Sequence, residues 1–156
     1  MRGPTMWSVG ERELFAATVA KWRSGPFCVG AHGADAAAKT MERLLVDTVL
    51  LDCHSASISV RLKSALAFLD VMKQGPGALS SGHVSATLRA GVAAEGLAYA
   101  IAVGTLFNTT ARYANALEFA VASGTEFDRA EGMLLKRGYA WGSSDPDEAD
   151  PGPPRG

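Results

Sequence analysis

Apolar residues recur along this chain at the three- and four-residue spacing of amphipathic helices. In the first such segment Phe15, Val19 and Trp22 form a bulky apolar stripe. No segment alternates apolar and polar residues as a half-buried strand would, and no internal repeat is visible. The pattern predicts an all-α fold of about six to eight helices, at residues 8–23, 26–40, 41–51, 57–74, 80–90, 94–121 and 127–137.

Local signals set the first helix boundaries. Ser8 and Glu11 have the spacing of a capping box, in which each side chain bonds the other residue's backbone N–H, so a helix begins after Ser8. Pro26 suits the first position of the next helix, because proline fixes φ and lacks an N–H. The sequence therefore predicts a break at Ser24-Gly25 between two consecutive helices.

Length and composition fit one domain with a short segment at each end. The 156 residues carry a formal net charge of −1, which gives no electrostatic case for binding nucleic acid or an anionic membrane. Two cysteines far apart in sequence fit a reducing compartment, and residues 1–10 contain no hydrophobic signal core, so we expect a cytoplasmic protein. The most apolar run, residues 92–107, contains Glu95 and two glycines and indicates a buried helix. The expected organisation is an N-terminal tail at 1–7, a helical domain at 8–140 and a disordered acidic, Pro/Gly-rich tail at 141–156.

Cys28 and His32 are candidate reactive residues because of their places in the second helix. Cys28 lies in the first turn, where the helix dipole and unpaired N–H groups favour the thiolate, so we expect its thiol to ionise more readily than a free cysteine. His32 lies four residues later on the same face, about 5–6 Å away between Cβ atoms. With Glu13 from the preceding helix, these residues would form a thiol, imidazole and carboxylate proton relay.

Each of these residues also has a purely structural interpretation. A cysteine in an Ala-rich helix is more often a small buried apolar residue, and a lone histidine is more often a structural group. Asp35 continues the face of Cys28 and His32, and either orients the imidazole or meets solvent; we favour solvent. Cys53 beside His54 makes a weak metal site, because two adjacent ligands lack a second pair, and a loop with an incidental thiol is favoured.

The run E-L-F-A-A-T-V-A, followed by G-P-F-C-V-G-A-H-G-A, closely resembles the active-site segment of the alkylhydroperoxidase D-like (AhpD-like), or carboxymuconolactone decarboxylase, family. In that family a Glu is followed twelve residues later by the first Cys of a C-x-x-C pair, and a His lies four residues after the second Cys. Glu13, Cys28 and His32 fall on the Glu, second-Cys and His positions. Gly25 falls where the first Cys belongs.

A later segment, L-F-N-T-T-A-R-Y-A-N-A-L-E, resembles the same family through Asn108, Arg112 and Asn115. We expect these three residues to make hydrogen bonds between helices or subunits. The resemblance implies an AhpD-like helical fold built on an antiparallel helix hairpin, with protomers that assemble into dimers, trimers or hexamers.

Three functions are compatible with these residues. The first, which the resemblance places foremost, is an alkylhydroperoxidase-like thiol oxidoreductase with peroxiredoxin-type antioxidant activity on hydroperoxides. Cys28 is then the nucleophile, His32 the proton shuttle and Glu13 the carboxylate that polarises it. Because Gly25 cannot resolve an oxidised Cys28, the reductant would be Cys53, a small external thiol or a partner protein.

The second function is a redox-independent, decarboxylase-like enzyme with Glu13 and His32 as acid and base. The third is a catalytically retired, oligomeric binding module. No cofactor is expected. A metal enzyme ranks last, because the only residues expected to converge as metal ligands are His32 and Cys28, with Asp35 or Glu13 as less favourable additions.

Overall fold

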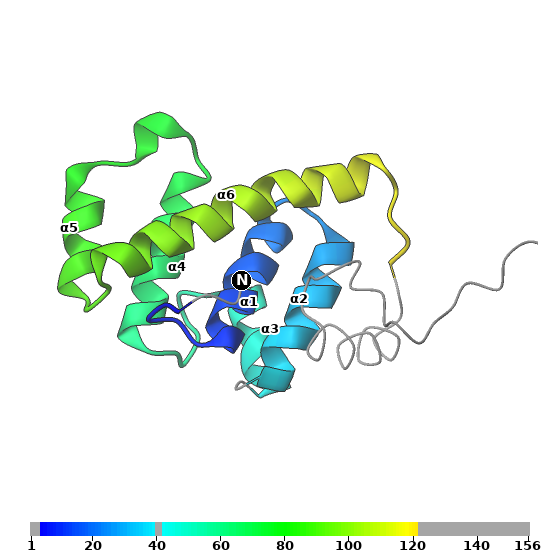
Figure 1. Cartoon of the computed structure of the whole chain (residues 1–156), viewed down its shortest axis with the longest axis horizontal. Helices are drawn as coiled ribbons and strands as arrows, with labels where there is room; N and C mark the ends of the chain where they lie inside the picture. The colour runs from blue at the N-terminus through cyan, green and yellow to red at the C-terminus, as the bar shows by residue number, and fades with distance from the viewer. Residues whose placement is uncertain (1–3, 40–41, 122–156) are drawn as a thin grey trace, which may run out of the picture.

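A computed structural model describes residues 4–39 and 42–121 of the chain. These residues form helices joined by turns, and there is no strand among them (Figure 1). The prediction of an all-α fold is therefore confirmed. The helices are α1 (Val9–Trp22), α2 (Pro26–Lys39), α3 (Arg43–Leu51), α4 (Val60–Met72), the short 3-10 helix η1 (Pro76–Ala78), α5 (Ser81–Arg89) and α6 (Ala94–Ala116).

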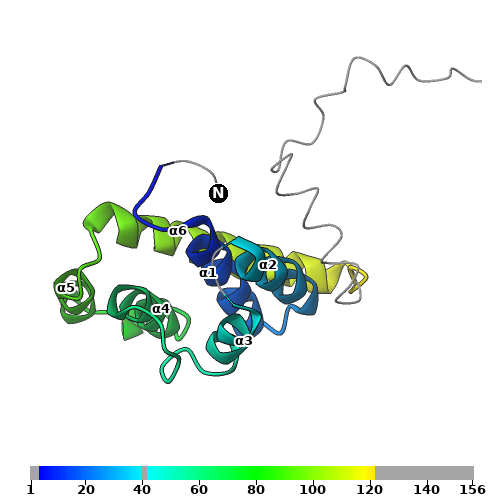
Figure 2. The same cartoon turned by 90° about the horizontal axis from the view of Figure 1, so that it is seen from below.

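Helix α1 lies at the centre of the molecule and packs against α2, α3, α4 and α6 (Figure 2). It begins with the predicted capping box, in which the amide of Glu11 donates to the Ser8 hydroxyl at 3.2 Å and the amide of Ser8 donates to the Glu11 carboxylate at 2.8 Å. The sequence pattern predicts one apolar stripe on this helix. The structure instead buries every residue from Arg12 to Ala20, because alanines on the remaining faces let neighbouring helices approach closely.

A tight turn joins α1 to α2 and sets the two helices side by side as a hairpin. The amides of Ser24 and Gly25 donate to carbonyls in the last turn of α1, at 3.1 and 2.9 Å, which is the bonding pattern of a Schellman turn. Ser24 adopts a φ of 52°, in the left-handed region that favours glycine. The Asn115 side chain on α6 donates to the carbonyls of Arg23 and Ser24 at 3.3 and 3.1 Å, which confirms the expected inter-helix role of Asn115.

Helix α6 runs across the hairpin and α4 as the longest element (Figure 1). The apolar pattern predicts a helix that continues to residue 121, but α6 ends at Ala116, and Leu117 and Val121 are exposed. The helix ends there because the chain turns back and Phe119 packs edge-on against Phe27 of α2, with ring centroids 5.4 Å apart.

The residues before α1 are anchored to the core. Trp7 is 1% exposed, its indole N–H donates to the carbonyl of Gly96 at 2.8 Å, and its ring packs edge-on against Phe15. The expected tail at 1–7 is therefore wrong for Trp7, because the indole gains both an apolar environment and a hydrogen-bond partner on α6. The expected helix at 127–137, the domain end at 140 and the tail at 141–156 lie outside the described residues.

The most apolar run, residues 92–107, contributes buried side chains to the core, and most of it lies in α6. Within the described ranges, no single helix is long and apolar enough to cross a membrane. Helices α5 and α6 together have the length and apolar composition of a membrane span, but the chain bends by 119° at the break between them.

Candidate active site

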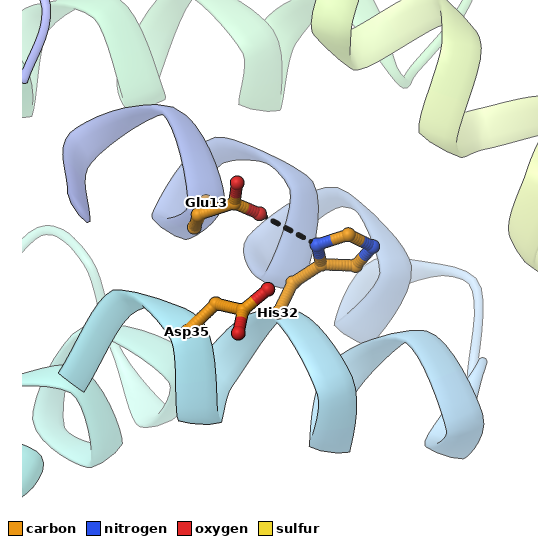
Figure 3. Close-up of side chains that lie close together, drawn as sticks. All are labelled: Glu13, His32 and Asp35. Atoms are coloured by element: carbon orange, nitrogen blue, oxygen red, sulfur yellow. Dashed lines mark hydrogen bonds and ion pairs between the residues drawn. The ribbon is translucent and has the colours of Figure 1, made fainter. Parts of the chain in front are cut away.

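Glu13 and His32 face each other between α1 and α2 (Figure 3). The Nδ1–H of His32 donates to the Oε2 atom of Glu13 at 2.7 Å. The two residues are 6% and 7% exposed, so little water screens this bond. Two residues that the sequence predicts as part of the site are thus in direct contact.

Helix α6 holds the imidazole from a second side. Phe107 packs edge-on against the His32 ring, with ring centroids 4.4 Å apart and an interplanar angle of 76°. The glutamate fixes one ring nitrogen and the phenyl group limits rotation of the ring, so three helices together set the orientation of His32. The sequence places Phe107 only among the apolar residues of its helix and gives no signal of this contact.

Asp35 belongs to the same buried group. It follows His32 by three residues on α2 and therefore lies on the same helix face, and it is 5% exposed. One carboxylate oxygen of Glu13, one of Asp35 and one imidazole nitrogen of His32 all lie within 4.8 Å of one another (Figure 3). The expectation that Asp35 meets solvent is wrong, because α1 covers this face of α2.

Cys28 occupies different surroundings from His32. Its side chain is 2% exposed and clusters with Ala20, Ala111 and Ala114. Burial raises the pKa of the Cys28 thiol. The expectation that this thiol ionises more readily than a free cysteine is therefore wrong, because burial among alanines removes the hydration that would stabilise the thiolate.

The position of the family's first cysteine is closed by packing. A Cβ atom added to Gly25 would lie 2.9 Å from the Cβ of Ala111 on α6, closer than real Cβ atoms approach. Gly25 is therefore required for α6 to pack against the α1–α2 turn. The resemblance assigns Gly25 to the first-cysteine position, and the structure shows that Ala111 occupies the space beside it.

Cys53 lies elsewhere in the core and belongs to a different cluster of buried residues from Cys28; both are free cysteines. Burial, together with the carboxylates of Asp70 and Asp52, raises the pKa of the Cys53 thiol. The neighbouring His54 points into solvent and pairs with Asp70 at 3.7 Å. Cys53 and His54 therefore do not converge, as the loop interpretation predicts.

A cavity of about 210 Å³ lies on another side of the central helix. Glu13, Cys28 and His32 are not among its lining residues, which are Val19, Trp22, Arg23, Leu69, Met72, Lys73, Gly104, Thr105 and Asn108. Asn108, one of the residues that carry the family resemblance, thus faces this cavity, whereas Arg112 is exposed.

Comparisons with known proteins agree with the fold. Neither a protein-family model nor a curated protein matches the chain. Among solved structures, an uncharacterized peroxidase-related protein from Silicibacter sp. TM1040 matches with a TM-score of 0.75 at 22% identity. The alkylhydroperoxidase AhpD core of an uncharacterized peroxidase-related protein from Ralstonia eutropha JMP134 matches with a TM-score of 0.76 at 23% identity.

Each match covers 82% of this chain and 66% of the other chain, slightly less than two thirds of that chain's length. Sequence identity this low establishes the architecture only. The chain has the all-helical AhpD-like fold that the segment around Glu13, Cys28 and His32 predicts.

Proposed function

We propose that this protein is an AhpD-like thiol peroxidase that uses one reactive cysteine, Cys28. The observation that carries the proposal is the buried hydrogen bond between Glu13 and His32, on a fold shared with peroxidase-related proteins. Cys28 precedes His32 by one helical turn on α2, a spacing that puts the two side chains on the same helix face and allows a direct or water-mediated proton transfer from sulfur to imidazole.

The proposed reaction begins with a protonated thiol, because burial raises the pKa of Cys28. Since Nδ1 of His32 donates to Glu13, the Nε2 atom is left to accept the thiol proton. The sulfur then attacks one oxygen of a hydroperoxide, the O–O bond breaks, and the leaving alkoxide takes the proton from His32. The products are an alcohol and a sulfenic acid on Cys28.

Small external thiols complete the proposed cycle. A first thiol attacks the sulfenic acid, releasing water and forming a mixed disulfide with Cys28; a second thiol restores Cys28 and leaves as a disulfide. An internal resolving thiol has no support here, because Ala111 fills the space beside Gly25 and Cys53 lies in another cluster.

A second candidate function, acid–base catalysis without sulfur chemistry, is favoured by Asp35. Glu13, His32 and Asp35 form a group of proton-transferring side chains that does not include Cys28. Such a group suits a decarboxylase-like reaction on a lactone, in which the bond to a carboxylate breaks, CO2 leaves and an acid delivers a proton to the carbon that held it.

Peroxide oxidation of Cys28 tests the first function. In a Cys53→Ser background Cys28 is the single thiol, so a dimedone adduct after peroxide addition reports its sulfenic acid. We expect His32→Gln to slow adduct formation by about 100-fold or more, the usual contribution of a general base. His54→Gln, a change of the exposed histidine, is the matched control and leaves the rate unchanged.

An unmodified Cys28 in millimolar peroxide would rule out the peroxidase. The acid–base function is then tested with γ-lactones of dicarboxylic acids. It requires that Cys28→Ala keeps turnover and that His32→Gln loses it, and the opposite pattern excludes it.

A further inference from the structure

We propose that Glu13, His32 and Asp35 form a binding site for a divalent transition-metal ion such as Zn²⁺ or Mn²⁺. The juxtaposition that carries this inference is two carboxylate oxygens and one imidazole nitrogen that converge between α1 and α2 (Figure 3). The inference goes beyond the proposed peroxidase and does not depend on any reactivity of Cys28.

The separation of the three groups suits a shared ion. Their ligand atoms lie within 4.8 Å of one another, and the Glu13 and His32 atoms are 2.7 Å apart. Ligands held about 2.0–2.2 Å from one ion lie roughly 3–3.5 Å from each other. Side-chain displacements of about 1 Å therefore bring all three atoms within bonding distance of one ion.

The two helices supply the ligands in an arrangement that helical metal proteins use. In carboxylate-bridged helical bundles, one helix gives a glutamate and a neighbouring helix gives a carboxylate and a histidine three residues apart. Here α1 gives Glu13, and α2 gives His32 and Asp35 at the same three-residue separation, with the histidine before the carboxylate rather than after it. The close packing of α1 on α2 fixes this geometry.

The donor set selects a class of ion. One imidazole and two carboxylates suit Zn²⁺, Mn²⁺ or Fe²⁺, whereas Ca²⁺ and Mg²⁺ prefer oxygen ligands alone. The ion takes the place of the proton that lies between His32 and Glu13. Three protein ligands leave at least one coordination position for water or a small anion.

Metal binding has a defined consequence for His32. The Nδ1 atom, which faces Glu13, becomes the metal ligand, so Nε2 carries the ring proton and cannot accept another. A bound ion therefore removes the base that the proposed peroxidase uses.

Isothermal titration calorimetry of the full-length protein with Zn²⁺ tests the site. We expect one Zn²⁺ to bind per chain and Asp35→Asn to weaken this binding by at least about 100-fold, more than the loss of an outer-shell partner. Asp70→Asn is the matched control, because Asp70 pairs with the exposed His54 and lies outside the site. Undiminished binding in Asp35→Asn, loss of binding in Asp70→Asn, or no stoichiometric binding to the wild-type protein would each overturn the inference.

If Asp35→Asn does not fold, nuclear magnetic resonance of the wild-type protein tests the metal site instead. In wild-type protein labelled with ¹⁵N-histidine, Zn²⁺ should shift the Nδ1 resonance of His32. An unchanged His32 signal at saturating Zn²⁺ would exclude the site. Both measurements use protein without peroxide, so they stand or fall separately from dimedone trapping of Cys28 in metal-free buffer.

Discussion

Helix α2 places two groups of functional side chains in opposite environments, one turn apart. Near its start, Cys28 is enclosed by alanines, and burial raises the pKa of its thiol. One turn later, His32 and Asp35 are equally buried but face the carboxylate of Glu13. Burial therefore suppresses ionisation in the first region, whereas in the second it strengthens a hydrogen-bonded polar group.

The segment that resembles the family active site has two parts, an acid–base pair and a cysteine pair, and they differ in the structure. The acid–base part, Glu13 and His32, has the contact that the motif predicts. At Gly25, to which the resemblance assigns the first-cysteine position, a Cβ atom would lie 2.9 Å from the Cβ of Ala111, so the structure leaves no room there for a side chain. The contact between Glu13 and His32 is present without any thiol at position 25.

The largest expected loss of stability follows from removing His32 from the polar group that it forms with Glu13 and Asp35. His32→Ala leaves the buried carboxylate of Glu13 without its imidazole partner, and it should lower the free energy of unfolding by about 3–5 kcal/mol. Urea denaturation followed by circular dichroism measures this change. His54→Ala, which removes an exposed histidine, should cost less than about 0.5 kcal/mol. Equal losses in the two variants would show that the Glu13–His32 bond does not stabilise the fold.

A smaller effect is expected at the closed dithiol position. Gly25→Ala adds a Cβ that meets Ala111 at 2.9 Å, and overpacking of this kind costs about 1–3 kcal/mol. Gly77→Ala is the control, because a Cβ there has nothing within 4 Å. In an Ala111→Gly background the cost of Gly25→Ala should shrink, and thermal unfolding of the four proteins in the cycle measures the coupling. An undiminished cost would mean that Ala111 is not what excludes a side chain from position 25.

The smallest expected effect is the difference in stability between two substitutions of Cys28. Cys28→Ser puts a hydroxyl among Ala20, Ala111 and Ala114, whereas Cys28→Ala keeps the site apolar. The proposed proton transfer requires Nε2 of His32 to lie within hydrogen-bond reach of position 28, so the serine hydroxyl should find an acceptor. The serine variant should therefore be less stable than the alanine variant by less than about 1 kcal/mol, below the usual cost of burying an unpaired hydroxyl. Guanidinium denaturation of both variants tests this. A larger loss in the serine variant would mean that the hydroxyl is unpaired and that His32 does not reach position 28.

The sequence predicts the helices and one contact of the site well, for physical reasons. Helical periodicity and the capping box at Ser8 are local signals, and the structure confirms both. The contact of Glu13 with His32 follows from the family resemblance, because the resemblance supplies the missing tertiary information.

Long-range packing decides the features that the sequence does not reveal. Asp35 appears solvent-facing until α1 covers it, and the thiol at Cys28 appears activated until alanines from α1 and α6 surround it. The sequence places Trp7 in a tail, whereas in the structure the carbonyl of Gly96 on α6 accepts its indole N–H. In each case a residue from a distant segment changes the environment of a correctly identified side chain.

The bridge from Asn115 to the α1–α2 turn has a consequence for synthesis of the chain. Asn115 follows the carbonyls of Arg23 and Ser24 by 92 and 91 residues, so the turn receives these donors only after nearly all of the helical region has been translated. While α6 is still untranslated, the α1–α2 hairpin of a ribosome-bound chain lacks the hydrogen bonds from Asn115. It also lacks the α6 alanines that pack against Cys28. The packing around Cys28 and the Phe107 contact that orients His32 are therefore completed together, when the last described helix docks.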